Sequence, residues 1–280
     1  MPGERLTIMS SPSSAHRSKS IRSFFKRIYS RHHSRRFEWL RNKIASLGKK
    51  QLSILELGCN DARSLSYVPA EVTRYVGLDA GWQSGWRNGK AFGLEAARHR
   101  FRQHPHFEFR ESDHCSDLEQ VSGTFDLAIV LETFEYLDPS RVEGYISALS
   151  RKLKADGSIL STMPNEKGIP LIVKALGSRL SGVPRSGYTM KQFGNAVFGR
   201  LDKVPRAIRG RRGFDYAKTA VLMSRYFPDT QLESIEPAHA PLWLSLNIGV
   251  SASKSSASVG LSEEQYSQSA AEYLCANSGK

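Results

Sequence analysis

Acidic residues gather at the ends of apolar segments in the middle of this chain. The stretch ILELGCNDARS, residues 54–64, passes from an apolar run through Glu56 to Gly58. Asp79 follows Gly58 by 21 residues and ends a second apolar run. A carboxylate at this place can accept hydrogen bonds from both hydroxyls of a ribose, each contributing roughly 1.5–3 kcal/mol. The spacing therefore indicates a nucleoside-binding site, with a helix N-cap as the alternative role of Asp79.

The loop after the first apolar run distinguishes between classes of cofactor. A dinucleotide fingerprint counted from Gly58 needs glycine at positions 60 and 63, where this chain has Asn60 and Arg63. Asn is the residue that best replaces a glycine with positive φ. Ala62 carries a cost only if its φ is positive, and with a negative φ the loop is an ordinary variant. We therefore expect no dinucleotide, but a loop that still binds a cofactor without a pyrophosphate.

Five buried strands are predicted to position these acids. They cover residues 52–58, 74–80, 106–113, 125–132 and 157–164, and the spacing of apolar residues over 139–154 predicts a helix before the last of them. Strands that alternate with helices form a parallel sheet with right-handed crossovers, and ligands bind at the carboxyl ends of its strands. Asp113 and the pair Glu132 and Glu135 close the third and fourth strands, so we expect them at the same edge as Asp79.

The C-terminal half departs from this alternation. Residues 165–225 hold many Gly, Arg and Pro and predict an inserted cap with short helices. Residues 231–238 and 243–254 predict two last strands, arranged as an antiparallel hairpin at the sheet edge. Residues 255–280 are a low-complexity tail, expected to be disordered except for a short helix near 263–274. The globular domain is therefore expected to span residues 49–254, with the cap inside it.

The N-terminal segment is basic and amphipathic. Residues 1–19 are expected to be disordered, and residues 20–48 to form two amphipathic helices, of which the second ends at Gly48. Three roles are open for the first helix: it packs on the domain, it forms an arm over residues 20–36 that contacts an anionic membrane or an acidic substrate, or it is a targeting peptide.

Composition and charge limit the class of protein further. The cysteines Cys59, Cys115 and Cys275 are odd in number and widely spaced, which favours a reducing compartment without structural zinc. No apolar run of about 18 residues and no secretory signal is present, so we expect a cytoplasmic protein with optional peripheral membrane contact. Of the formal charge of +13, residues 1–50 carry +11 and residues 174–225 carry +10, which leaves −8 for the rest. Either the basic segments contact an anionic partner, or they are solvated surface.

At this point the motifs resemble those of the class I S-adenosylmethionine-dependent methyltransferases, over roughly residues 52–168 with weaker support at 230–254. LELGCNDA resembles the first motif LELGCGxG, VGLDA the segment with the ribose acid, and FRESD the segment that contacts the adenine. FDLAIVLETFEYL is similar to FDxVxxxxxxEHL, and LKADGSILSTMPNEKG to LKPGGxLxxxxPN. The resemblance implies a Rossmann-like, doubly wound α/β fold. Its mostly parallel seven-stranded sheet would have an antiparallel last strand, with N-terminal helices and a basic cap after the fifth strand.

The resemblance also implies which residues contact S-adenosylmethionine. The turn formed by Gly58, Cys59, Asn60 and Asp61 would pass under the methionine part, with Glu56 near its amino group.

For the nucleoside part, Asp79 would bind the ribose hydroxyls, and Asp113 the adenine amine with backbone help from His114. Glu132 or Thr133 would lie beside the sulfonium. No metal site is expected.

The acceptor side is less well defined by the motifs. An oxygen or nitrogen acceptor needs a base, for which the candidates are Glu135, Tyr136 and His114. The family often has Glu-His where this chain has Glu135-Tyr136, which puts a histidine-based mechanism in doubt, and Tyr136 alternatively packs over the sheet end. Trp82 and Trp86 either line the pocket or stack on the surface.

The basic cap over residues 165–225 is expected to set the specificity. Its charge suggests an anionic acceptor, which we expect to be a small molecule, a saccharide or a lipid-linked compound. Nucleic acid ranks lower, because the basic residues lack the interleaved aromatic residues of a single-strand platform. A non-catalytic binding protein and an RNA or protein methyltransferase remain the alternatives, and the oligomeric state is not indicated.

Overall fold

The computed structural model describes residues 34–181 and 187–254 of the chain. The disorder predicted for residues 1–19, most of the arm over residues 20–36, Cys275 and the tail with its predicted short helix therefore lie outside the described residues. Within them, Cys59 and Cys115 are free thiols.

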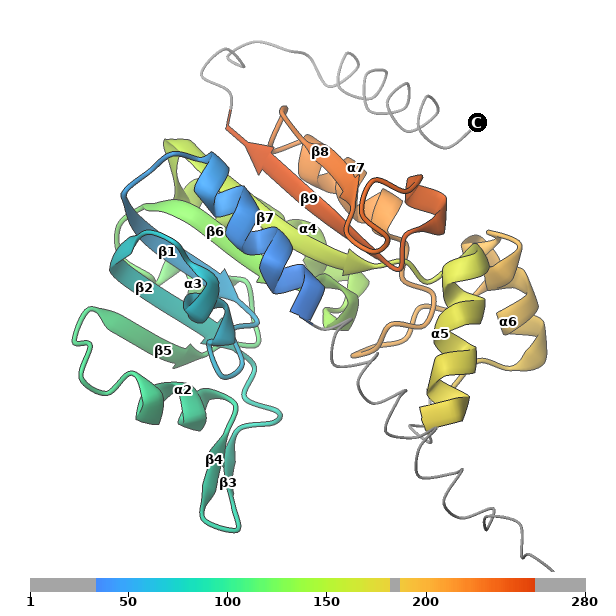
Figure 1. Ribbon diagram of the computed structural model, residues 1–280, viewed down its shortest axis with the longest axis horizontal. Helices are drawn as coiled ribbons and strands as arrows, with labels where there is room; N and C mark the ends of the chain where they lie inside the picture. The colour runs from blue at the N-terminus through green and yellow to red at the C-terminus, as the bar shows by residue number, and fades with distance from the viewer. Residues whose placement is uncertain (1–33, 182–186, 255–280) are drawn as a thin grey trace, which may run out of the picture.

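Seven strands form one mixed sheet, as predicted (Figure 1). Its order is β5-β2-β1-β6-β7-β9-β8, and every neighbouring pair is parallel except the two that involve β9. The strands are β1 (Gln51–Leu57), β2 (Glu71–Asp79), β5 (Phe107–Glu111), β6 (Phe125–Leu131), β7 (Leu153–Pro164), β8 (Gln231–Ser234) and β9 (Asn247–Ser253). The two last strands pair as the predicted hairpin, but β9 lies between β7 and β8, so that β8 forms the edge.

Helices cover both faces of the sheet. The helices on the faces are the N-terminal helix (residues 34–46), α2 (Leu94–Arg100), α3 (Ser116–Glu119), α4 (Pro139–Lys152) and α7 (Tyr216–Ser224). Two more helices, α5 (Gly168–Ser181) and α6 (Met190–Val197), follow β7. The described residues also contain four short 3-10 helices, η1 (Arg63–Tyr67), η2 (Phe134–Tyr136), η3 (Leu201–Lys203) and η4 (Leu242–Leu244). None of the helices in these described segments is both long and apolar enough to cross a membrane.

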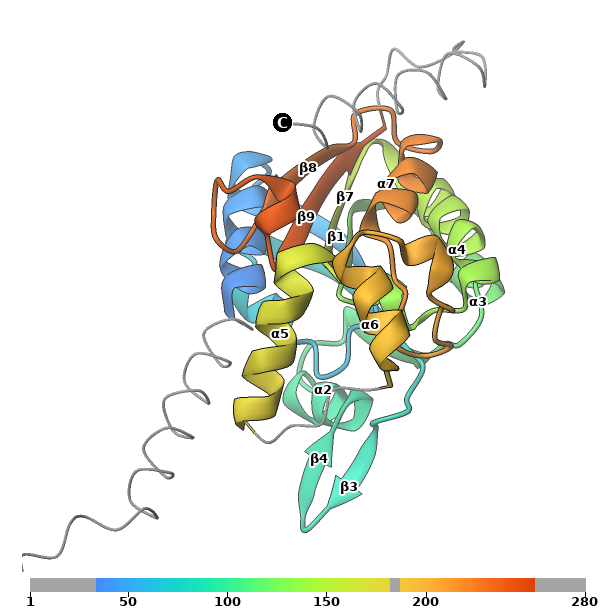
Figure 2. The ribbon, with the colours of Figure 1, turned by 90° about the vertical axis from the view of Figure 1, so that its right-hand side faces the viewer.

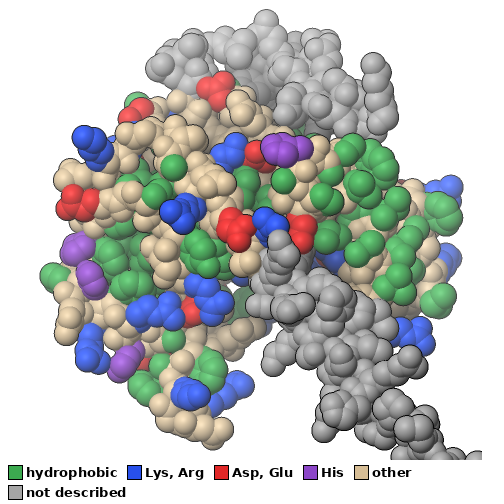
Figure 3. Space-filling view, in the orientation of Figure 1, with side chains coloured by type: hydrophobic (Ala, Val, Ile, Leu, Met, Phe, Trp, Pro, Cys, Tyr) green, Lys and Arg blue, Asp and Glu red, His purple; other side chains and the backbone are tan. Residues whose placement is uncertain are grey.

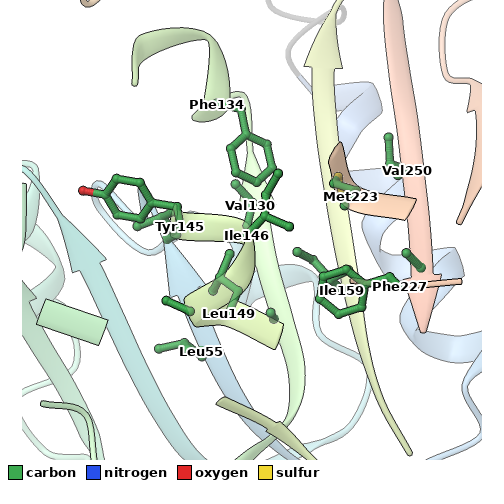
Figure 4. Close-up of a cluster of buried hydrophobic side chains, with 14 of the residues drawn as sticks. Leu55, Val130, Phe134, Tyr145, Ile146, Leu149, Ile159, Met223, Phe227 and Val250 are labelled. Atoms are coloured by element: carbon green, nitrogen blue, oxygen red, sulfur yellow. The ribbon is translucent and has the colours of Figure 1, made fainter. Parts of the chain in front are cut away.

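The period of two along β1 explains the two hydrophobic layers. Leu55 and Leu57 belong to the core on the side of α3, α4 and α7, whereas Leu52 and Ile54 belong to the core under the N-terminal helix and α2. Figure 4 shows the first of these cores, in which apolar side chains of α4 meet those of the sheet. The sheet is therefore buried on both faces, as a mostly parallel sheet requires.

The sequence of α4 shows why this helix forms where the apolar spacing predicts it. The side chain of Asp138 accepts a hydrogen bond from the backbone N–H of Ser140 at the N-cap, and Pro139 occupies the first turn. Tyr145, Ile146 and Leu149 then point into the core. The helix ends at Lys152, because Leu153 already pairs with β6. For the same reason β7 begins four residues before the predicted start at Gly157.

The segment after β7 divides between two packing environments. The helices α5 and α6 and the residues after them enclose a small core of Leu171, Ala196, Leu201 and Val204. Figure 2 shows α5 and α6 side by side beyond the end of the sheet. In contrast, α7 packs on the sheet, since Tyr216 and Met223 belong to the core around α4. The long link between β2 and β5 holds a hairpin of β3 (Gly85–Arg87) and β4 (Lys90–Phe92) before α2.

A single carboxylate connects the amino-terminal ends of three neighbouring strands. Asp126 of β6 accepts hydrogen bonds from the backbone N–H and the hydroxyl of Ser53 in β1, at 2.9 and 2.6 Å. The ammonium of Lys154 in β7 lies 2.9 Å from both of its oxygens. Burial raises the pKa of Asp126, but the bonds from Ser53 and Lys154 outweigh burial, so the pKa lies below its usual range. Asp126 therefore stabilises the centre of the sheet as a charged group.

We expect Asp126→Asn to lower the free energy of unfolding at pH 7 by roughly 2–3 kcal/mol, because hydrogen bonds to a charged group are lost. A carboxyl with a depressed folded pKa stabilises the fold above its unfolded pKa of about 3.9, and this contribution disappears as the pH falls through the folded value. The difference between wild type and variant should thus shrink in urea unfolding below about pH 4. Asp156→Asn is the control, since this exposed residue contacts only Lys49 among the described residues, at 2.7 Å. Equal effects of both changes would contradict the assignment.

Candidate cofactor site

In the loop after β1, every second residue from Gly58 to Ala62 has a left-handed conformation. The φ values are 75° for Gly58, 49° for Asn60 and 52° for Ala62. The prediction that Asn60 replaces a glycine with positive φ is thus confirmed. The φ of Ala62 is also positive, so the loop is not the ordinary variant that a negative φ would have made it. An L-residue in this conformation costs roughly 1–2 kcal/mol, which the buried side chain of Ala62 must offset by packing.

Asp79 connects this loop to the end of β2. One carboxylate oxygen accepts a hydrogen bond from the backbone N–H of Asn60 at 3.0 Å, and the other from that of Gly81 at 2.9 Å. The next helix, α2, begins only at Leu94, so Asp79 is not the helix N-cap that the sequence left open. A carboxylate offers about four lone-pair directions. Asp79 therefore shapes the loop and retains acceptor capacity for a ligand.

Gly58 lacks a side chain because Thr133 occupies that space. A Cβ at Gly58 would lie 2.1 Å from the Thr133 hydroxyl oxygen, which is far inside van der Waals contact. The Thr133 hydroxyl is within 3.2 Å of the Leu57 carbonyl and 3.1 Å of the Leu131 carbonyl, to which it can donate. The loop after β1 and the segment after β6 are thus in direct contact at the point where the resemblance implied the sulfonium.

The acid inside β1 is enclosed by protein. Glu56 accepts hydrogen bonds from the hydroxyls of Ser64 and Tyr75, at 2.5 and 2.6 Å. Burial raises the pKa of Glu56 to about 7, although these two bonds oppose the shift. The Cys59 side chain is also buried, close to Gly77 of β2, so only its backbone is available to a ligand in the loop.

The remaining residues implied for the cofactor are more open. The carbonyl and the carboxylate of Asp61 accept bonds from Arg100, at 3.1 and 3.4 Å. Asp113 and His114 follow β5 and are exposed. The Asp113 carbonyl accepts a bond from Arg141, and the His114 ring contacts the Ser116 hydroxyl.

Three buried carboxylates follow β6 and β7, and we call Glu132, Glu135 and Glu166 the buried carboxylate cluster. One oxygen of Glu132 binds Arg36 at 2.6 Å and Arg211 at 2.7 Å, while the other accepts a bond from Asn247 at 3.3 Å. Burial disfavours the charge of Arg211, but Glu132 and Glu135 outweigh this and raise its pKa. Arg211 is therefore a permanent cation between two of the carboxylates.

Glu135 is the least satisfied member of the cluster. It is fully buried, and within the described part of the chain neither of its oxygens has a hydrogen-bond partner. The Nε of Arg211 lies 3.6 Å away, beyond hydrogen-bond distance, and likewise has no such partner there. Burial and the charge of Glu132 raise the pKa of Glu135 to about 8, against the opposing effect of Arg211. Buried polar atoms of this kind are typical of sites that bind a polar ligand or water.

Residues 205–213 form a basic loop whose arginines contact the site. Arg206 donates to the carbonyls of Phe134 and Glu135, at 3.3 and 2.6 Å. The Arg209 guanidinium stacks on the Trp82 ring at 4.5 Å, and that of Arg211 lies 5.7 Å from the Tyr136 ring. The loop therefore reaches from the segment after β6 to the segment after β2.

The two tryptophans of the link after β2 have different neighbours. Trp82 stacks beneath Arg209, so it belongs to the contact between the cap and the link after β2. Trp86 lies in β3, with its ring edge against His99 of α2. Both indoles remain about half exposed, which favours the surface stacking that was one of the two sequence interpretations.

Several residues of this site were missed by the sequence analysis, namely Arg36, Glu166, Arg206, Arg211 and Asn247. Glu166 carried the best signal, because it follows the predicted strand 157–164 within the motif PNEKG. The two cap arginines belong to the basic run that the sequence did identify, but the run alone does not distinguish inward from outward side chains.

The sequence matches a family model described as a methyltransferase domain over residues 29–207. Comparison with curated proteins gives no significant match. Among solved structures, a TehB-like SAM-dependent methyltransferase from Corynebacterium glutamicum is 16% identical, with a TM-score of 0.45, covering 77% of this chain and 87% of that chain. Magnesium protoporphyrin IX methyltransferase from Synechocystis, with bound SAH, is 13% identical, with a TM-score of 0.47, covering 88% and 90%. The family match includes the loop, Asp79 and the buried carboxylate cluster.

We expect Arg211→Met to lower the free energy of unfolding by about 3 kcal/mol or more near pH 8, because breaking a buried ion pair leaves carboxylates uncompensated. Without Arg211 the pKa of Glu135 rises further above its unfolded value. A carboxyl with a raised folded pKa stabilises the fold fully below its unfolded pKa and loses that contribution as the pH rises. The deficit should therefore grow from pH 5 to pH 9 in urea unfolding.

Arg209→Met is the matched control in the same loop, since its exposed stacking on Trp82 is worth less than about 1 kcal/mol. A deficit of Arg211→Met that does not depend on pH would contradict the proposed charge compensation.

Proposed function

This chain belongs to the methyltransferase domain family, and we propose that it uses S-adenosylmethionine to methylate an anionic acceptor, which is a small molecule, a saccharide or a lipid-linked compound. The family membership confirms the resemblance that the motifs indicated. The observation that carries the cofactor assignment is the hydrogen bond from the Asn60 N–H to Asp79, because it joins the loop and the acid at the carboxyl edge of the sheet.

The residues at this edge fit the cofactor. When bound, S-adenosylmethionine supplies an electrophilic methyl group on a sulfonium. Asp79 would accept hydrogen bonds from the ribose hydroxyls with its remaining lone pairs, and the exposed Asp113 would bind the adenine amine. The loop around Asn60 would hold the methionine part through its backbone.

The segment after β6 would lie beside the reacting end. Of the two residues implied there, Thr133 contacts the loop at Gly58, whereas Glu132 is held by Arg36 and Arg211. We therefore assign the position beside the sulfonium to Thr133 and a positioning role to Glu132. Alignment of two reactants can contribute roughly 7–11 kcal/mol to the rate, so the chain's main task is to hold this geometry.

Glu135 is the best placed of the three candidate bases. His114 is exposed and its ring contacts Ser116, and burial raises the pKa of the Tyr136 hydroxyl, which disfavours its ionisation. The Glu135 carboxyl is fully buried beside Arg211 of the basic loop, and its pKa of about 8 lies near neutral pH. A base with such a pKa is well matched to proton removal from an acceptor hydroxyl or amine.

The acceptor would enter under the cap formed by α5, α6 and the basic loop. Arg206 and Arg211 point inward and bind the segment after β6, so they contribute less to an incoming anion than their charge suggests. The exposed cations Arg179, Lys191, Arg200 and Lys203 would attract an anionic acceptor toward the cap before it enters. We propose that this cap sets the specificity.

We expect Asp79→Ala to weaken binding of S-adenosylhomocysteine by roughly a hundredfold or more, since two charged hydrogen bonds to the ribose are lost. Isothermal calorimetry measures this, with circular dichroism to verify the fold. Glu71→Ala, at the opposite end of the same strand, is the control and should bind as wild type does. If the wild-type protein binds neither S-adenosylhomocysteine nor S-adenosylmethionine, the cofactor assignment is wrong.

Methyl transfer should become faster as the pH rises through about 8, because Glu135 accepts a proton only when its carboxyl is ionised. Glu135→Gln should lower the rate at pH 9 by roughly a hundredfold or more and remove this dependence. The assay measures the transfer of label from tritiated S-adenosylmethionine to the lysate fraction that incorporates it. The affinity for S-adenosylhomocysteine is the control. An unchanged pH profile in the variant would exclude Glu135 as the base.

A further inference from the structure

The helices α5 and α6 of the cap expose large apolar side chains, which we call the cap face and define by Ile169, Val173, Leu176, Met190 and Phe198. Ile169, Val173 and Leu176 of α5 follow a spacing of four and three residues, so they share one side of the helix. Met190 begins α6 and is 87% exposed, and Phe198, directly after α6, is 79% exposed. Figure 3 shows hydrophobic side chains gathered where Figure 1, in the same orientation, draws α5 and α6, with Lys and Arg at the outer edge.

The opposite sides of these helices are already used. Leu171 of α5 and Ala196 of α6 are fully buried in the small core of the cap. Lys174 of α5 points back to the Asn165 carbonyl and to Glu166. The cap face is therefore not the packing side of either helix, and its exposure is a property of the folded domain. Soluble domains rarely leave such apolar side chains together on the surface without a partner.

The charges around the cap face have one dominant sign. Arg179 of α5 and Lys191 of α6 are exposed, as are Arg200 and Lys203 immediately after α6. Among the described residues of α5, α6 and η3, Asp202 is the only acid, and it is exposed. Apolar side chains rimmed by Lys and Arg are the combination that binds the interface of an anionic bilayer, where the apolar groups insert and the cations meet lipid headgroups.

We propose that the cap face docks on an anionic membrane surface. The contact requires no spanning helix, because α5 and α6 would lie along the membrane surface and insert their exposed apolar side chains. The helix α5 begins two residues after Glu166 of the buried carboxylate cluster. A membrane at the cap face would thus bring lipid headgroups close to the candidate site. The consequence that the acceptor is lipid-linked rests on the proposed function, whereas the docking itself does not.

The test is sedimentation of the full-length protein with vesicles of phosphatidylcholine alone or mixed with phosphatidylserine. Wild type should bind the mixed vesicles, and added salt should weaken the binding. Val173→Glu with Leu176→Glu should lower the bound fraction roughly tenfold, since two apolar contacts are replaced by negative charges. The control is Phe92→Glu, because this similarly exposed apolar residue lies in the β3–β4 hairpin.

Two further variants separate the alternatives. Arg200→Glu with Lys203→Glu tests the rim without changing any apolar residue, and should also weaken the binding. Phe24→Glu with Phe25→Glu tests the N-terminal arm. If only the arm variant loses binding, or if wild type does not bind the mixed vesicles, the proposal is wrong. It is also wrong if ultracentrifugation shows a wild-type dimer that the Val173 and Leu176 change dissociates.

Calorimetry with S-adenosylhomocysteine distinguishes this proposal from the proposed function. The Val173 and Leu176 variant should retain wild-type cofactor affinity, which also shows that it is folded. Loss of vesicle binding with intact cofactor binding supports the docking surface. Vesicle binding by a wild-type protein without affinity for the cofactor would overturn the proposed function and leave the docking surface standing.

Discussion

The compensation of charge around Glu132 joins four segments that are distant in the sequence. The carboxylate follows β6, Arg36 comes from the N-terminal helix, Arg211 from the cap, and Asn247 from β9. A buried carboxylate without partners is so costly that these contacts have to form together. The N-terminal helix, the cap and the last strand are consequently held at one place on the carboxyl edge of the sheet, which is where the loop after β1 and Asp79 also lie.

The same contacts change how the charge of the cap is understood. Its basic residues divide into an inward set, exemplified by Arg206 and Arg211, and an outward set on α5, α6 and η3. The inward set neutralises carboxylates and binds carbonyl groups of the protein itself. Only the outward set is available to a partner, and it surrounds exposed apolar side chains. The net charge of the segment therefore overstates the charge of its surface, because the inward arginines are bound by groups of the protein itself.

The sheet was predictable from sequence because each strand carries its own local pattern of buried residues, and α4 carries both an apolar spacing and a cap at Asp138. The candidate site was predictable only in part. Glu132 and Asp79 were identified as acids at strand ends, but Glu132 and Arg211 are separated by 79 positions and Glu132 and Asn247 by 115. Side-chain contacts over such distances leave no periodic trace in the sequence, so the partners of Glu132 became visible only in the fold.

The loop after β1 shows why counting glycines is a poor test of a binding turn. Three positions have positive φ, but only Gly58 needs to be glycine for steric reasons, because Thr133 occupies the place of its side chain. Asn60 tolerates the conformation and is fixed by its bond to Asp79. Ala62 is strained, yet its methyl group is buried with the apolar residues of β1 and α2. A glycine at position 62 would relieve the strain and leave a gap in that core, so packing and the Asp79 carboxylate, more than glycine content, determine the shape of the loop.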